Sequence, residues 1–122
     1  MGVPNLAAYS ATKWGVIGLA KSLALEVAKE GITINVVCPC TVETPMVLNN
    51  SMYSVFAPDV ALTNPGELDE RVLERFRRVN PIHQPWIEPE DVTRAVMHLV
   101  TDPGVLTGSV MEIGLGSSAR LH

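Results

Sequence analysis

Two side chains near the start of the chain, Tyr9 and Lys13, have types and a spacing that suit proton transfer. Residues four apart on a helix project from the same face and can meet the same ligand. A tyrosine titrates at about pH 10 in water, too high for efficient proton exchange at neutral pH, and a close ammonium group lowers that pKa by favouring the phenolate. Such a pair can take a proton from an alcohol or return it to a carbonyl. The same spacing also arises by chance, with the ring packed on a neighbour and the lysine in water.

The elements expected to position this pair are a long helix and a short parallel strand. The sequence predicts a helix over residues 6–30, capped by Asn5 and ended by Gly31, with apolar residues beyond one face, so we expect it to be buried on two sides. Residues 32–38 read ITINVVC, a strand covered on both faces that Pro39 ends, and a second strand is expected over 108–113. This order predicts an α/β fold, in which ligands bind beyond the carboxyl ends of strands, here at residues 39–46.

The remaining segments predict a substrate-binding loop and two helices. Residues 47–65 lack clear periodicity, which favours a lid or binding loop with room for short helical turns. A helix is expected to follow, with Asn64 as its cap, Pro65 in its first turn and an apolar face that begins at Leu68, and to end near Asn80. A last helix begins at about Pro89 and is broken at residues 102–104, Asp-Pro-Gly.

Length, composition and charge restrict the class of protein. The 122 residues suffice for one core, and 47% hydrophobic with 18% charged residues excludes a disordered tail. A net charge of −4 argues against a nucleic-acid partner, and the four arginines between 71 and 78 alternate with acids, as on a solvated helix face. No apolar run is long enough to cross a bilayer and no signal peptide is evident, so we expect a cytoplasmic protein without a membrane partner. Cys38 and Cys40, with scattered histidines, do not make a metal site, and two reduced, mostly buried thiols are expected.

The frame around the Tyr9–Lys13 pair resembles the short-chain dehydrogenase/reductase family. The resemblance lies in YSATKWGVIGLAKSLALEVAKEGITINVVCPCTVETPM, continues in PIHQPWIEPEDVTRAVMHLVTD and LTGSVMEIG, and covers the chain from about Pro4 to Gly116. It implies an oxidoreductase that interconverts a secondary alcohol and a ketone with NAD or NADP. By this resemblance Tyr9 is the general acid/base, and Lys13 binds the nicotinamide ribose and lowers the tyrosine pKa.

The resemblance also implies a cofactor loop after the first strand. Pro39, Thr44, Pro45 and Met46 match the family's Pro-Gly…Thr-Pro-Met pattern, with Thr44 and the backbone of Val42 expected to contact the nicotinamide carboxamide. Cys40 stands where the family usually has glycine, and cysteine tolerates a positive φ poorly. CPCTVETPMVLNN is similar to the mycofactocin-associated branch of the family, which includes carveol dehydrogenases and uses tightly held NAD. Met46, Tyr53 and Phe56 are the candidates for the substrate pocket.

Two other features look functional but are better explained as parts of the structure or the surface. GLGSSA near the end of the chain formally fits a glycine-rich dinucleotide motif, but no helix can follow it, so it is expected to be a strand end and tail. His83 and His98 have no partner implied by spacing and are expected to be structural or surface residues.

The family's phosphate-binding loop and active-site serine would precede Met1, so the chain resembles the family's C-terminal half. We therefore expect one partial domain over 1–122: the C-terminal portion of a Rossmann-like, doubly wound parallel sheet without its N-terminal βαβ units. Two hypotheses follow: an oxidoreductase in which Tyr9 moves the proton, and an inactive truncated fragment that only self-associates. The resemblance implies a dimer or tetramer formed through the 6–30 helix and the C-terminal strand. Neither the substrate nor the choice between NAD and NADP can be read from these residues.

Overall fold

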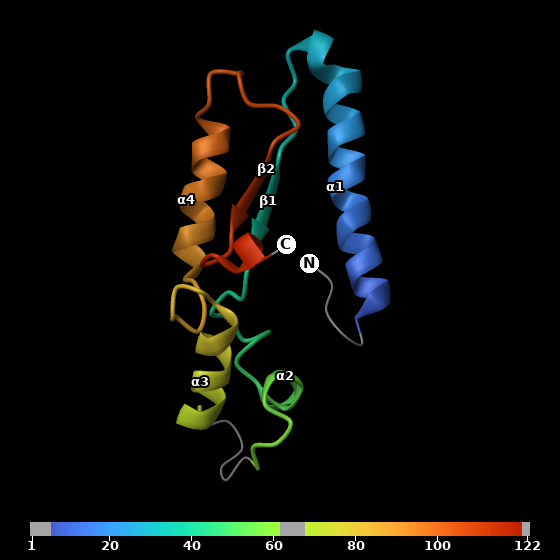
Figure 1. Cartoon of the computed structure of the whole chain (residues 1–122). Coiled ribbons are helices and arrows are strands. Elements are labelled where there is room, and N and C mark those ends of the chain that lie inside the picture. Colours follow the sequence, from blue (N-terminus) through green and yellow to red (C-terminus); the bar gives the residue numbers. More distant parts are fainter. Residues whose placement is uncertain (1–5, 62–67, 121–122) are drawn as a thin grey trace.

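The structure is a computed structural model that describes residues 6–61 and 68–120, and it has the α/β architecture that the sequence predicts (Figure 1). The helices and strands follow in the order α1 (Ala7–Val27), β1 (Val36–Pro39), α2 (Asn50–Phe56), α3 (Glu70–Val79), α4 (Pro89–Val100) and β2 (Val110–Ile113). Short 3-10 turns follow α1 at Ala28–Glu30 and β2 at Ser117–Arg120. Among the described residues, no helix is both long and apolar enough to cross a membrane.

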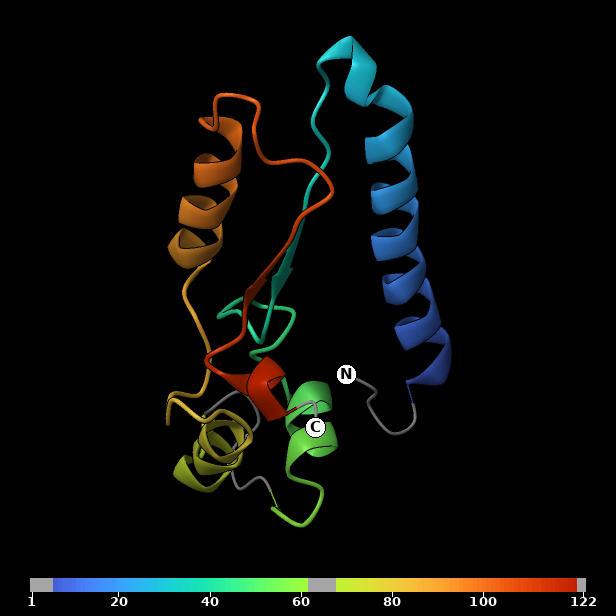
Figure 2. The same cartoon turned by 45° about the horizontal axis from the view of Figure 1, so that its top comes forward.

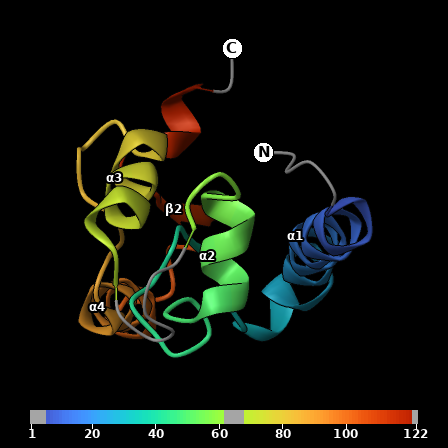
Figure 3. The ribbon, with the colours of Figure 1, turned by 90° about the horizontal axis from the view of Figure 1, so that it is seen from below.

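The two strands form a parallel sheet between two helices. β1 pairs with β2 in the register Val36 to Val110 and Pro39 to Ile113. Helices α1 and α4 lie on opposite sides of this sheet, and α2 and α3 lie beyond the carboxyl ends of the strands (Figures 1 and 2). The view from below shows the same layering, with β2 between α4 and α1 (Figure 3). The carboxyl ends of both strands therefore point toward α2 and α3, and α1 starts on this side of the sheet (Figure 1).

Helix α1 has the predicted extent but not the predicted burial. With its 3-10 turn it ends at Gly31, which adopts φ of 72°, the left-handed conformation that glycine allows. The expected cap, Asn5, lies outside the described residues. Ala24 is the only residue of α1 that is buried, and it lies beside Gly108, whose carbonyl accepts from the Lys21 Nζ at 3.4 Å. Within the chain the helix is therefore covered less than expected, and its burial by another subunit stays a prediction.

Strand β1 begins four residues later than predicted and includes Pro39. Residues 32–35 precede the regular strand and are held by side-chain bonds in addition to a backbone bond, in which the Gly108 N–H donates to the Ile34 carbonyl at 2.7 Å. The Ile34 N–H donates to the Thr107 hydroxyl, and the Asn35 amide donates to the Leu106 carbonyl while accepting from the Ser109 N–H. These bonds align the two segments before the regular pairing starts, and the strand of four residues begins at Val36.

The break predicted after α4 is a turn organised by one carboxylate. Asp102 accepts hydrogen bonds from the backbone N–H groups of Gly104, Val105 and Leu106 at 2.7–2.9 Å. These bonds favour the ionised carboxylate and hold the pKa of Asp102 below its usual value. The turn delivers the chain to β2 directly after α4.

Helix α3 starts later than the sequence suggests. Leu68 lies outside the helix, and Asp69 is the cap, because its carboxylate accepts from the Arg71 N–H at 2.8 Å. The predicted signals Asn64 and Pro65 lie outside the described residues. The arginines pair with acids as expected of a solvated face: Arg71 with Asp69, Arg75 with Asp59, Arg77 with Glu70 and Glu74, and Arg78 with Glu74.

The best-buried side chains lie between α2 and α3, away from the sheet. Phe76 and Val72 are fully buried and pack with Tyr53 and Ala57. The Phe76 ring has three aromatic neighbours, with centroids 6.4 Å from Tyr53, 4.5 Å from Phe56 and 5.7 Å from Trp86. Asn80, at the end of α3, is also buried. Its side-chain amide donates to the carbonyls of Gln84 and Pro85, which holds the following segment against the helix end. The segment expected to be a binding loop thus has a core of its own.

Replacing Phe76 by alanine should lower the free energy of unfolding by about 3–5 kcal/mol, because it empties the centre of this cluster. Urea denaturation followed by circular dichroism measures the change. Val55→Ala, in α2 at a side chain that is 62% exposed, is the matched control and should change stability by less than about 0.5 kcal/mol. A loss below about 1 kcal/mol in Phe76→Ala would show that the cluster does not stabilise the chain.

Candidate active site

The loop after β1 is held from two sides. The Cys40 N–H continues the sheet by donating to the Ile113 carbonyl at 2.9 Å. On the other side Val42 forms a parallel β-bridge with Ile87, in which the Ile87 N–H donates to the Thr41 carbonyl at 3.0 Å and the Glu43 N–H donates to the Ile87 carbonyl at 2.9 Å. The backbone of residues 40–43 is therefore fixed by two segments far away in the sequence.

A hollow of about 440 Å³ opens between this loop and α4. Pro39, Val42 and Thr44 line one side of it, so the structure brings together three of the predicted cofactor-binding residues. The other side is formed by residues that the sequence did not assign to a site: Pro89, Val92, Thr93, Val96 and Met97. The only signal for them was an apolar repeat at helical spacing, which is equally typical of a helix packed on a core.

Tyr9 and Lys13 meet on the first turns of α1. The Lys13 Nζ lies 5.4 Å from the centroid of the Tyr9 ring, and the Tyr9 side chain is 55% exposed. This end of α1 lies at the same end of the molecule as the carboxyl ends of β1 and β2 (Figure 1). Among the described residues, however, no hydrogen bond or ion pair joins Tyr9 or Lys13 to the loop over 40–44. The predicted site residues thus form two separate groups.

The three candidates for a substrate pocket are placed differently from one another. Tyr53 is buried against Phe76, and burial raises the pKa of its phenol. Phe56 is half-buried on the same cluster, while Met46 is 80% exposed. None of the three lines the hollow beside Thr44. A role in substrate binding stays a prediction for all of them.

The C-terminal residues behave as a strand end and tail, as the sequence predicts. The Leu115 carbonyl accepts from the Ile82 N–H at 2.9 Å, and Gly116, at φ of 85°, approaches Pro81 so closely that a Cβ would lie 3.0 Å from its ring. A single 3-10 turn follows. The tail therefore packs on the segment after α3 and presents no helix to a phosphate. Within the described residues no group of histidines, cysteines and acids is arranged to hold a metal ion.

Comparison with known proteins supplies the context for this geometry. A family model described as short chain dehydrogenase matches residues 1–52. The chain is 37% identical over 120 residues to (-)-trans-carveol dehydrogenase of Rhodococcus erythropolis. The matched region covers 98% of this chain and 42% of that protein. The chain belongs to the short-chain dehydrogenase/reductase family.

Solved structures of the family agree with this membership. Carveol dehydrogenase from Mycobacterium avium in complex with NAD superposes with a TM-score of 0.88 at 31% identity, covering 98% of this chain and 42% of that one. A variant of actinorhodin polyketide ketoreductase with NADPH superposes with a TM-score of 0.76 at 33% identity. This match covers 96% of this chain and 42% of that one. The chain thus spans about two fifths of the length of the relatives that it matches. Its α/β fold corresponds to that portion of the family's Rossmann-type sheet, and the predicted resemblance to carveol dehydrogenases is confirmed.

The cysteine at the family's usual glycine position causes no backbone strain. Leu115 is the one non-glycine residue with a positive φ in the described part of the chain, so Cys40 lies outside the left-handed region. Its N–H is used in the sheet-like bond to Ile113, which an extended residue of any type can make. Both thiols are free and half-buried, less buried than the sequence suggests. Burial is the main cause that raises the pKa of each, with a smaller contribution from Glu112 at Cys38 and from Asp91 at Cys40.

Native Cys38 and Cys40 should therefore react slowly with iodoacetamide at about pH 8, because only the thiolate is nucleophilic and its fraction falls as the pKa rises. Mass spectrometry of the alkylated chain measures both rates, and the urea-unfolded chain, in which the pKa returns to its usual value, should react several-fold faster. A Val105→Cys variant supplies an exposed thiol as the matched control in the folded protein. Equal rates at positions 38, 40 and 105 would contradict the raised pKa values.

Proposed function

We propose that this chain carries the proton-transfer and nicotinamide-contacting residues of an enzyme that interconverts a secondary alcohol and a ketone. The observation that carries the proposal is the contact between Tyr9 and Lys13, at the end of the molecule where the strands of a short-chain dehydrogenase end. Ligands of open α/β sheets bind at this edge. Relatives named carveol dehydrogenase and ketoacyl reductase support the substrate class, an alcohol or ketone.

In the proposed reaction Tyr9 moves the proton. During oxidation its phenolate takes the proton of the substrate hydroxyl, and during reduction its hydroxyl returns a proton to the carbonyl oxygen. The ammonium of Lys13, 5.4 Å from the centroid of the Tyr9 ring, would hold the ribose of the cofactor. A bound nicotinamide supplies the group that accepts or delivers the hydride. Exposed on the first turns of α1, Tyr9 and Lys13 are accessible to both molecules.

The residues of the loop fit a nicotinamide cofactor. Among the described residues, the hydroxyl of Thr44 makes one bond, a long one of 3.4 Å to the Val42 carbonyl, so it remains able to bind a carboxamide. Pro39, Val42 and Thr44 share one hollow, and Cys40 is held in the sheet beside them. We propose NAD as the cofactor, with NADP as the alternative, because family structures hold either one. Met46, Tyr53 and Phe56 are proposed to border the substrate, and the predicted cytoplasmic location stays a prediction.

Tyr9→Phe should lower turnover by about a hundredfold to ten-thousandfold while leaving NAD binding intact, because it removes the proton-transferring hydroxyl alone. Two preparations are measured with NAD, NADP and a panel of secondary alcohols that includes carveol. One is the chain itself; the other is Rhodococcus erythropolis carveol dehydrogenase in which this chain replaces the matching 42%. Exposed Thr12→Val on the same turn, whose hydroxyl bonds only the Tyr9 carbonyl, is the control that should keep activity. Turnover undiminished by Tyr9→Phe in an active preparation would refute the proposal.

A second candidate is supported by the surface of α1. Large apolar side chains on different sides of this helix are exposed: Trp14 (58%), Val16 (54%), Leu19 (58%) and Leu25 (81%). A helix that is apolar all round is normally buried, and an exposed patch of this kind is typical of an interaction surface. The second candidate is therefore a module that only self-associates. It would form a dimer or tetramer through α1 and the β2 edge.

If α1 is such an interface, Leu19→Glu should raise the dissociation constant of the dimer or tetramer about tenfold or more, because a buried leucine contributes about 1.5–3 kcal/mol. Sedimentation equilibrium measures the constant. Val105→Glu, at an equally apolar side chain that is 77% exposed on the loop before β2, should leave it unchanged. A monomeric wild-type chain that turns over an alcohol with NAD would eliminate this candidate.

A further inference from the structure

The β-bridge between Val42 and Ile87 is the connection between the proposed cofactor loop and α4. Ile87 is 5% exposed, and two backbone hydrogen bonds, to Thr41 and from Glu43, flank it. It is a single bridge between two irregular segments, with no ladder on either side. Its stability therefore depends on the side chains next to it.

Those side chains are two glutamates. The register that pairs Val42 with Ile87 places Glu43 beside Glu88, on the next step of both segments. Like charges directly opposite each other across paired strands are destabilising. A hydrogen bond between the two carboxyl groups relieves this repulsion, and it requires one of them to be protonated. This hydrogen bond is the largest cause that raises the pKa of Glu88, followed by burial and by the charges of Glu43, Glu90 and Asp91.

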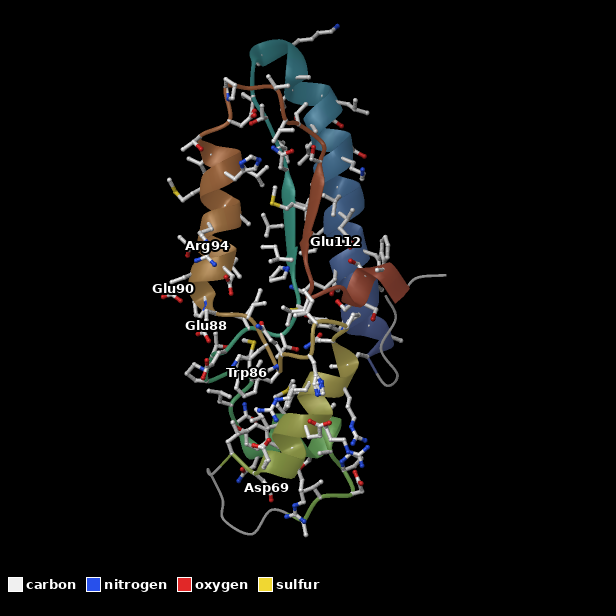
Figure 4. All side chains as sticks on the ribbon, turned by 60° about the vertical axis from the view of Figure 1, so that its left-hand side comes forward. Asp69, Trp86, Glu88, Glu90, Arg94 and Glu112 are labelled. Atoms are coloured by element: carbon white, nitrogen blue, oxygen red, sulfur yellow. The ribbon has the colours of Figure 1, made fainter. Side chains whose placement is uncertain are left out.

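The surrounding charges leave the pair without a cation. Glu90 and Asp91 face Glu88 from the first turn of α4, and Asp91 also accepts from the Glu88 N–H at 2.9 Å. Arg94 pairs with Asp91. Cys40, at the end of β1, faces Asp91 as well. In the described ranges no ion pair includes Glu43 or Glu88, and Figure 4 shows Glu88, Glu90 and Arg94 along the start of α4.

We propose that Glu43 and Glu88 form a proton-dependent latch that holds the cofactor loop against the start of α4. With one proton the carboxyl groups bond to each other and reinforce the Val42–Ile87 bridge. When both are ionised they repel across the same bridge, and residues 41–44 are held less firmly. This inference rests on the proposed function, because it gives that loop a pH-dependent hold on nicotinamide.

The sign of the effect follows from the direction of the shift. The pKa of Glu88 is raised above the usual value of 4.5, so the folded chain binds this proton more tightly than the unfolded chain. The latch therefore contributes fully to the stability of the folded chain below the usual pKa of 4.5. This stabilisation is lost as the pH rises through the raised pKa of the folded chain. Other carboxyl groups have the opposite effect on stability, because their pKa values are lowered in the folded chain: Asp69, Glu74 and Asp102. The stability that they contribute is lost as the pH falls. A measurement confined to the bridge is therefore needed.

Amide hydrogen exchange of the Glu43 and Ile87 N–H groups in the full chain is that measurement. At low ionic strength, where exposed charges are screened least, protection factors corrected for intrinsic exchange should fall about two- to fivefold between about pH 4.5 and pH 7.5. In Glu43→Gln the fall should vanish, because a neutral amide can bond Glu88 at either pH. Glu90→Gln keeps the pair intact and is the matched control in which the fall should persist.

Protection in the wild type that is independent of pH, or a fall that persists in Glu43→Gln, would overturn the latch. If Glu43→Gln does not fold, Glu88→Gln replaces it, and the carboxyl ¹³C titration of the wild-type chain serves as a direct readout. Titration of Glu88 at its usual pKa would likewise overturn it. None of these readouts requires cofactor. NAD binding without a latch would therefore refute this inference alone, and a working latch in a chain that binds neither NAD nor NADP would refute the proposed function alone.

Discussion

The arrangement of the candidate site depends on hydrogen bonds that the backbone makes just beyond the end of β1. The Cys40 N–H is bound by Ile113, and two residues later the chain is bound by Ile87. Ile87 directly precedes α4 and Ile113 ends β2, so the loop is held between these two segments. The same pairing places Pro39, Val42 and Thr44 beside Val92 and Val96, and it sets Glu43 beside Glu88. Without these bonds, neither the hollow nor the carboxyl pair would exist.

Burial is distributed unevenly around this loop. Beyond the carboxyl ends of the strands, α2 and α3 enclose Val72 and Phe76 completely, and Asn80 satisfies its amide within the same cluster. The sheet and α1 are covered less: the strand residues are mostly half-buried, and α1 buries Ala24 alone. Since apolar burial is the main source of stability, the cluster below the sheet is the firm part of this chain. Helix α1, which carries Tyr9 and Lys13, exposes Trp14, Leu19 and Leu25 to a partner.

Membership of the short-chain dehydrogenase/reductase family relates these features to longer proteins of the same fold. The chain matches about two fifths of its relatives, and the match includes the helix, strand and loop in which proton transfer and nicotinamide contact are proposed. Cys40 shows how this chain differs locally without changing the architecture. Cysteine stands where the resemblance implies glycine, yet its backbone avoids the left-handed region and its N–H bonds the Ile113 carbonyl.

Local signals in the sequence determined the helices and the chemistry that one turn can hold. Gly31 ends α1, Pro89 begins α4, and four-residue spacing alone places Lys13 over the Tyr9 ring, because each of these effects acts within one or two turns of backbone. Tertiary structure decided what depends on distant partners. Asn35 and Thr107 supply side-chain bonds just before β1 begins, and Tyr53 is buried because α3 packs over it. The hollow and the Glu43–Glu88 contact arise from pairing between residues more than forty positions apart, a register that no local pattern encodes.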